Sequence, residues 1–277
     1  MKIERIFLLL FVLMGLFSCT ASRYIYAPAP ANNPFFKEKG ESKLTASYSE
    51  GDGNQNGYAR GWDLQGAYAL SNHWAVTASY FNRREMDRNS ISNSNVSEIK
   101  YKRNLLGFGS GYFIALNSKK TITFNLYAGL DFGKFSFDDK DISNPNSSDS
   151  RFHSSNITKG YFQPSFNFMP GKYIRFSFFM KSSYVGYGDI KTSYTSDELK
   201  YYSLDELGGK TWNFLEFGWD FQFGIPKYPW IRLEWQVSSI NWTVDPYYLN
   251  YQRPDVRRSN FSIGLTIDFS KMKDKID

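Results

Sequence analysis

This chain of 277 residues has a single cysteine, Cys19, so it cannot form an internal disulfide. After residue 18 no apolar run approaches the roughly 20 residues that a membrane-spanning helix needs. The sequence has no glycine-rich phosphate loop, no zinc-ligand set and no heptad repeat. We therefore expect no cofactor and no bound metal, and the fold must be sought in shorter repeating patterns.

Charge is also modest, whereas aromatic residues are plentiful. The net charge is +6, and Lys and Arg form no run, so no nucleic-acid partner is expected. Aromatic residues make up 19% of the chain, which is many for an ordinary enzyme. Strands of a membrane barrel combine such content with low average hydropathy, because every second residue faces a polar interior.

The first 18 residues form a secretory leader. Lys2 and Arg5 precede the apolar stretch 6–17, a short pattern typical of a cleaved signal. The tetrapeptide Leu16-Phe17-Ser18-Cys19 resembles the lipobox of bacterial lipoproteins, which implies cleavage before Cys19 and lipidation of that residue. The alternative is an ordinary signal peptide with an incidental cysteine. No acidic cluster follows Cys19, so we expect the lipid in the inner leaflet, facing the periplasm.

Residues 19–41 are interpreted as a lipidated periplasmic tether. The segment Ala27-Pro28-Ala29-Pro30-Ala31-Asn32-Asn33-Pro34 cannot form a helix or a central strand, because proline lacks the amide donor and fixes φ. An extended conformation is expected.

Ten segments alternate apolar and polar residues with the period of two that is typical of strands. The clearest is the last, in which Phe261, Ile263 and Leu265 alternate with Ser262 and Gly264. Many of these segments have the 9–11 residues that a tilted strand needs to cross hydrocarbon. The predicted strands are 42–50, 59–70, 74–84, 98–116, 121–138, 156–168, 172–189, 211–225, 229–243 and 257–270. Pro164 predicts a bulge in the sixth.

The connections alternate between tight and long. Tight turns are expected at 71–73, 117–120, 169–171 and 226–228, and long polar loops near 51–58, 85–97, 139–155, 190–210 and 244–256. Tight turns belong on the periplasmic side of an outer-membrane barrel and long loops outside. Both ends of the chain then lie on the tight-turn side, where a lipid on Cys19 would also hold the N-terminus. A soluble β-sandwich is the alternative, but it leaves the difference in loop length unexplained.

A short stretch before the first strand carries a family resemblance. The residues Asn33-Pro34-Phe35-Phe36, with Lys39-Gly40-Glu41, resemble the start of outer-membrane β-barrel lipoproteins of the Bacteroidetes type. The resemblance implies an outer-membrane location and brings no catalytic residues. We predict an all-β fold, a transmembrane antiparallel up-and-down barrel of about ten strands. The divisions are a signal peptide at 1–18, the tether at 19–41, the barrel at 42–270 and a periplasmic tail at 271–277.

The inward face of this barrel is polar and carries both signs of charge. A barrel of about ten strands is narrow enough for side chains to fill, and isolated buried charges are costly, so the charges should pair. We expect an ion network that plugs the bore, formed by Asp220, Arg232, Glu234, Arg175 and Glu216. Two registers of the hairpin 211–243 remain open: Asp220 lies opposite Glu234 in one and diagonal to it in the other. A carboxylate pair that shares a proton is the alternative to a structural network.

Three functions fit this architecture. The first is a non-enzymatic structural or accessory barrel that docks an outer-membrane or periplasmic protein, through the tether or the aromatic loop 245–251. The second is a narrow channel for small solutes. The third is a surface hydrolase that uses His153, which the sequence places in a polar outer loop. Membrane lipid is an expected partner in all three.

Overall fold

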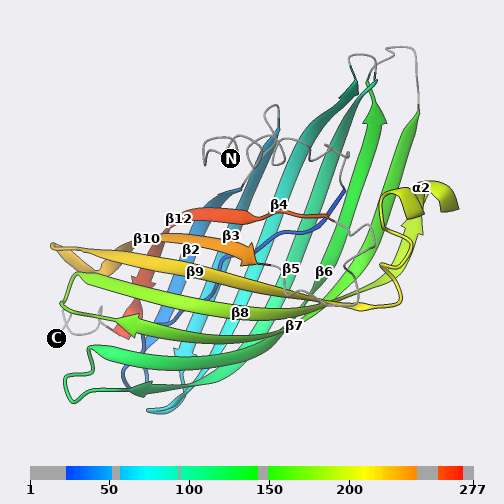
Figure 1. Cartoon of the computed structure of the whole chain (residues 1–277). Helices are drawn as coiled ribbons and strands as arrows, with labels where there is room; N and C mark the ends of the chain where they lie inside the picture. The colour runs from blue at the N-terminus through cyan, green and yellow to red at the C-terminus, as the bar shows by residue number, and fades with distance from the viewer. Residues whose placement is uncertain (1–22, 52–56, 93–94, 143–148, 242–254, 271–277) are drawn as a thin grey trace, which may run out of the picture.

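A closed barrel of ten antiparallel strands forms the body of the molecule (Figure 1), in a computed structural model that describes residues 23–51, 57–92, 95–142, 149–241 and 255–270. Each barrel strand pairs with the next along the chain, and the last closes on the first. The barrel strands are β2 (Ser42–Gly51), β3 (Tyr58–Ala69), β4 (Trp74–Ser92), β5 (Asn95–Ala115), β6 (Ile122–Asp141), β7 (Ser150–Phe168), β8 (Ile174–Thr192), β9 (Thr211–Ile225), β10 (Tyr228–Asn241) and β12 (Ser259–Asp268). The predicted fold class and the ten strands are confirmed.

Closure leaves no unpaired strand edge in the wall, which a barrel in lipid requires. The closing pair joins β12 to β2, with Leu265 opposite Ala46. Pro164 stays in register with Leu126 on β6, so the bulge predicted at this proline is wrong. On the β8 side no pair forms at residues 163 and 164, but the pairing resumes at Ser165 in the same register, so the proline leaves the alignment of β7 and β8 unchanged.

One wall of the barrel is much taller than the other. Strands β4 to β8 have 19–21 residues, whereas β2, β3, β9, β10 and β12 have 10–15. Three of the loops predicted as long, 85–97, 139–155 and 190–210, are in part strand. The five tall strands therefore rise beyond the rest of the wall at the long-loop end (Figure 1).

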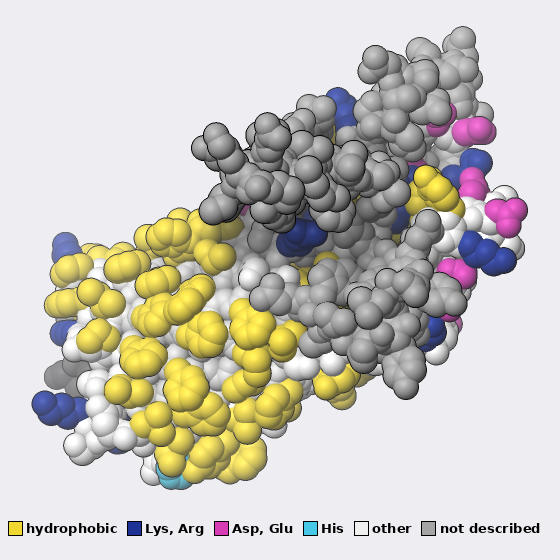
Figure 2. All heavy atoms as spheres, viewed as in Figure 1, with side chains coloured by type: hydrophobic (Ala, Val, Ile, Leu, Met, Phe, Trp, Pro, Cys, Tyr) yellow, Lys and Arg dark blue, Asp and Glu magenta, His cyan; other side chains and the backbone are white. Residues whose placement is uncertain are grey.

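The outer surface carries an apolar band on the half nearest the tight turns (Figure 2). Its exposed side chains are those that the alternating pattern places outward, for example Leu106, Phe132 and Leu265. Aromatic residues such as Trp74 and Trp62 lie at the two edges of the band. This is the surface of a membrane-spanning barrel. Within the described residues, no helix is long and apolar enough to cross a bilayer.

Above the band, the interior of the tall wall holds an aromatic core. Tyr101, Phe135, Phe137 and Tyr187 are buried together there. A short parallel sheet of β1 (Tyr24–Tyr26) and β11 (Asp255–Val256) packs against them, as do residues of the long loop that contains α2 (Ser196–Tyr201). The helix α2 begins at a capping box between Thr195 and Glu198. None of these three short elements was predicted.

Candidate functional site

The bore of the barrel is occupied by the chain's own N-terminal segment, residues 23–36. Every residue of this segment except Tyr24 and Asn32 is buried. The prediction of a tether outside the barrel is therefore wrong for these residues. The physical reason lies in its composition: small alanines and prolines give a thin extended chain, which fits within a bore of this width.

Amide side chains of the wall hold the backbone of this segment. Gln236 accepts a hydrogen bond from the Ala31 amide at 2.5 Å and donates one to the Ala31 carbonyl at 2.9 Å. The Pro34 carbonyl accepts from Asn125 at 3.0 Å and from Asn167 at 3.3 Å. Prolines bring no amide donor into the bore, so mainly carbonyls need partners there, and the wall supplies donors.

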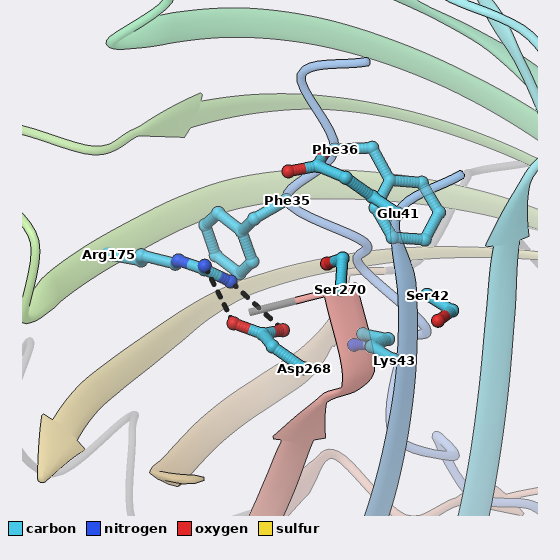
Figure 3. Close-up of a pocket in the computed structure, with 8 residues that line it drawn as sticks. All are labelled: Phe35, Phe36, Glu41, Ser42, Lys43, Arg175, Asp268 and Ser270. Carbon is cyan, nitrogen blue, oxygen red and sulfur yellow. Dashed lines mark hydrogen bonds and ion pairs between the residues drawn. The ribbon is translucent and has the colours of Figure 1, made fainter. Parts of the chain in front are cut away.

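The segment crosses the barrel from end to end. Arg23 pairs with Asp139 at 2.5 Å, near the long loop that follows β6. At the tight-turn end, Phe35 lies 5.6 Å from the Arg175 guanidinium and Phe36 packs on Phe113. Figure 3 shows Phe35 and Phe36 beside Arg175 and Asp268, with Lys43 nearby.

This path corrects the expected placement of the chain ends. Asp268, at the end of the last strand, lies on the tight-turn side as expected, but Arg23 lies at the long-loop end. The first described residue and the end of the last strand therefore lie at opposite ends of the barrel. Cys19 itself lies outside the described residues.

The predicted ion network is divided into separate groups. Arg175 and Arg232 both bind the Asp268 carboxylate, at 2.8 and 3.0 Å. The predicted network did not include Asp268, which lies on the same inward face of β12 as Ser262. These three residues form a cluster at the tight-turn end of the bore.

The two carboxylates of the β9–β10 hairpin adopt the diagonal register. Glu234 lies opposite Gln222, and Asp220 lies opposite Gln236. Glu234 accepts hydrogen bonds from Gln222 at 2.7 Å and from Thr266 at 2.6 Å, and Lys43 lies 3.9 Å away. Hydrogen bonds from neutral side chains and one lysine thus surround Glu234, rather than the arginines that we expected.

Glu216 serves the N-terminal segment directly. Its carboxylate accepts hydrogen bonds from the Tyr26 hydroxyl at 2.7 Å and from Ser183 at 2.9 Å. Tyr26 also stacks on Phe214, with ring centroids 4.2 Å apart. Glu216 therefore does not pair with Arg232 as predicted; instead it holds the outer part of the segment through Tyr26.

A second buried charge cluster was missed. Glu85 pairs with Arg83 at 2.7 Å, Arg103 at 3.2 Å and Arg257 at 3.0 Å, and Arg257 also binds Asp87. Burial alone would raise the pKa of Glu85, but the three arginines lower it to about 2. Glu85 lies one residue beyond the predicted end of its strand. Extending the alternation past residue 84 would have placed it inward.

This cluster also clamps the outer end of the segment. Arg103 donates to the Ile25 carbonyl at 3.2 Å, and the Arg257 guanidinium lies 4.0 Å from the centre of the Tyr24 ring. Charged residues of the wall therefore hold both ends of residues 23–36.

Two cavities in the described part of the bore are small. One of about 20 Å³ lies between Pro30, Asp63 and Lys181, and one of about 10 Å³ lies beside Phe35 and Arg175 (Figure 3). Each has room for about one water molecule.

His153 is buried, contrary to its predicted place in a polar outer loop. It lies on β7, faces inward and stacks on Phe137 with centroids 5.2 Å apart. Burial lowers its pKa to about 4. Neither ring nitrogen has a hydrogen-bond partner among the described residues, so no catalytic pair forms there. The described residues contain no group of three His, Cys, Asp or Glu that could hold a metal ion.

Comparison with known proteins places no family name on the chain. No family model matches, and no curated protein is significantly similar in sequence. Solved structures that it resembles include the translocator domain of autotransporter NalP from Neisseria meningitidis, with 12% identity over 83% of this chain and 88% of that one, and a TM-score of 0.49. The transport unit of the autotransporter AIDA-I from Escherichia coli is 10% identical over 84% of this chain and 90% of that one, with a TM-score of 0.46. The outer membrane protease OmpT from the same species is 10% identical over 83% of this chain and 95% of that one, with a TM-score of 0.42. At these values no function is transferred, and the fold rests on the strand pairing itself.

Proposed function

We propose that this protein is a non-conducting barrel of a bacterial outer membrane that docks a protein partner, with its long loops outside the cell. The observation that supports this best is the filled bore: residues 23–36 occupy it from one end to the other. A channel for small solutes would need the volume that this segment fills. The tall wall of β4 to β8 offers surface beyond the membrane, as a docking function needs.

The buried site of His153 disfavours a surface hydrolase. Residues 23–36 of the tether are no longer candidates for partner contact, because they lie inside the barrel. The aromatic loop 245–251 lies outside the described residues. The outward face of the tall wall is therefore the described surface that we propose for docking.

Planar-bilayer recording tests the non-conducting barrel. The full-length protein is expected to insert without single-channel steps, and steady steps would contradict the proposal. A double variant, Gln236→Ala with Gln163→Ala, removes side chains that hold Ala31 and Asn32 and keeps the chain length. This variant is expected to show brief openings, which would show that the barrel inserts under these conditions, so that silence of the wild type reports a closed bore.

We also propose cleavage before Cys19, acylation of that cysteine and an N-terminus on the outer side of the membrane. The path of the segment supports the last point, since Arg23 lies at the long-loop end. An epitope inserted after Ser22 should bind antibody on intact cells. Binding only after permeabilisation would place this end in the periplasm. Loss of palmitate labelling in Cys19→Ser would test acylation separately.

Co-purification from native membranes in mild detergent tests the partner. A companion protein should remain bound to wild type and be lost from Asp138→Arg with Phe152→Arg, which alters two facing, exposed residues on the outward side of the tall wall. Ser118→Arg, in a tight turn, is the matched control and should retain it. A barrel that purifies alone in every case would contradict docking.

A further inference from the structure

A row of like charges crosses three neighbouring strands of the outer wall. Register places Arg60 opposite Arg84, and Arg84 opposite Lys102, on β3, β4 and β5. All three side chains are exposed and face outward. Like charges directly opposite one another destabilise a sheet. A bound counter-charge would remove this penalty.

Lys134 on β6 extends the row to a fourth strand, because it lies opposite Asn104, next to Lys102 in the sheet. We call Arg60, Arg84, Lys102 and Lys134 the cationic row. Among the described residues none of the four forms an ion pair, although Glu50 faces Arg60 across the β2–β3 pair.

Two other cations of the same wall are neutralised. Farther from the membrane, Arg88 and Lys100 both pair with Glu98, at 3.1 and 2.8 Å. The contrast is local, since Arg84 and Lys102 of the cationic row lie on the same two strands, β4 and β5, as these paired residues. The row therefore differs from an ordinary solvated face, on which charges of both signs alternate.

The cationic row lies at the edge of the apolar band. On the membrane side of the row, the outward side chains of the same strands include Trp62, Tyr80, Leu106 and Phe132, whereas Tyr58 and Met86 face outward beyond it on β3 and β4. Trp62 and Tyr80 contact each other, with ring centroids 5.0 Å apart. Tryptophan and tyrosine mark the level of lipid headgroups in membrane proteins. Arg60 and Lys134 are the next outward residues after Trp62 and Phe132, whereas Arg84 and Lys102 follow Asn82 and Asn104. The row thus faces the polar part of the leaflet on the long-loop side.

We propose that the cationic row binds the phosphate groups of an anionic glycolipid in the leaflet at the long-loop end. This inference rests on the proposed outer-membrane location and orientation. Arginine matches phosphate oxygens in a bidentate manner, and lysine adds a mobile point charge. Neighbouring strands are about 4.8 Å apart, so adjacent side chains of the row can reach one phosphate group.

The test uses full-length protein in phosphatidylcholine vesicles that contain a fixed fraction of diphosphoryl lipid A. After extraction in mild detergent, native mass spectrometry counts the lipid A that remains bound. The test variant is Arg60→Gln, Arg84→Gln and Lys102→Gln. The matched control removes three exposed cations from tight turns: Lys119→Gln, Lys172→Gln and Lys227→Gln.

Wild type and the control should retain lipid A, and the test variant should bind it about one hundredfold more weakly, at roughly fivefold for each cation near a charged surface. Lipid A without its phosphates should not be retained. Equal retention by wild type and the test variant, or equal retention of the dephosphorylated lipid, would overturn the proposal.

Inorganic phosphate distinguishes a free ion from a headgroup. At about tenfold molar excess over the lipid, it should leave the bound lipid A in place, because the glycolipid also contacts the apolar band. Complete release would identify a phosphate-ion site and overturn the headgroup assignment. Conductance is a separate readout, so a failed docking or plug hypothesis does not alter the interpretation of this result.

Discussion

The two halves of β6 have opposite polarity along one continuous strand. In the half near the tight turns, Phe132 is outward and 48% exposed, and Asp131 is inward and buried. In the outer half, Lys134 is outward and exposed, and Phe135 is inward and 0% exposed. The period of two is unchanged. What changes is the medium outside the wall, which is lipid for the first half and water for the second.

The N-terminal segment, residues 23–36, makes a different kind of contact in each half of the barrel. Inside the membrane-spanning half, wall amides bind its backbone, as Gln236 binds Ala31. Inside the outer half, its side chains join the aromatic core, as Tyr26 stacks on Phe214. The difference indicates that the outer half is stabilised like a soluble core, whereas the inner half depends on hydrogen bonds and ion pairs.

The largest expected effect comes from the buried charges. Glu85→Gln leaves Arg83, Arg103 and Arg257 buried without their shared carboxylate, and should lower the free energy of unfolding by about 3–5 kcal/mol. Denaturant unfolding in detergent micelles, followed by tryptophan fluorescence, measures it. Glu98→Gln, which breaks pairs with two exposed cations, should cost less than about 1 kcal/mol. Equal losses would show that the cluster is not buried.

Two phenylalanines on β6 separate the halves directly. Phe135→Ala opens a cavity in the aromatic core and should lower the free energy of unfolding by about 3 kcal/mol. Phe132→Ala should cost about 1 kcal/mol, because detergent or lipid can fill the space that the ring leaves. The same unfolding assay applies. A larger loss for Phe132 than for Phe135 would contradict the inversion of polarity.

Acid should weaken the outer half selectively. The unfolded chain protonates His153 near pH 6.5, but the folded protein does so only near pH 4, so stability falls as the pH drops through this window. From pH 7.5 to pH 5 the loss that His153 contributes should be about 2 kcal/mol, at about 1.4 kcal/mol per pKa unit. His153→Phe preserves the stacking on Phe137 and should remove this part of the pH dependence. An unchanged pH profile in the variant would show that the imidazole is solvated.

The smallest expected effect concerns the hydrogen bonds between Gln236 and the N-terminal segment. Gln236→Ala removes both hydrogen bonds to Ala31 and should weaken that contact by about 1–2 kcal/mol. Hydrogen–deuterium exchange at the Ala31 amide should become about tenfold faster. Ser238→Ala, two residues along the same strand, is the control and should leave the exchange rate as in wild type. Equal rates in all three proteins would mean that Gln236 does not hold the segment.

Alternation and loop lengths were enough to predict the barrel, its ten strands and the polar lining of the bore in the membrane-spanning half, but not inward residues of the outer half such as Glu85 and His153. It could not predict where each strand leaves the membrane, because Phe135 and Lys134 continue the same period with the opposite sense. It also could not show that Pro28 and Pro30 enter the bore. An extended segment rich in alanine and proline has the same sequence pattern whether it lies outside the barrel as a tether or inside it as a plug. The split of Arg232 from Glu234 depended on the register and on Asp268, which no local pattern determines.

The central claim is that residues 23–36 occupy the bore, and thiol cross-linking tests it most directly. In a Cys19→Ser background, a short bifunctional thiol reagent should join Ala31→Cys to Gln236→Cys in the folded barrel and change its mobility in denaturing gels. Val237→Cys in place of Gln236→Cys faces outward and should not be joined. Equal cross-linking of both pairs, or none to position 236, would contradict an occupied bore.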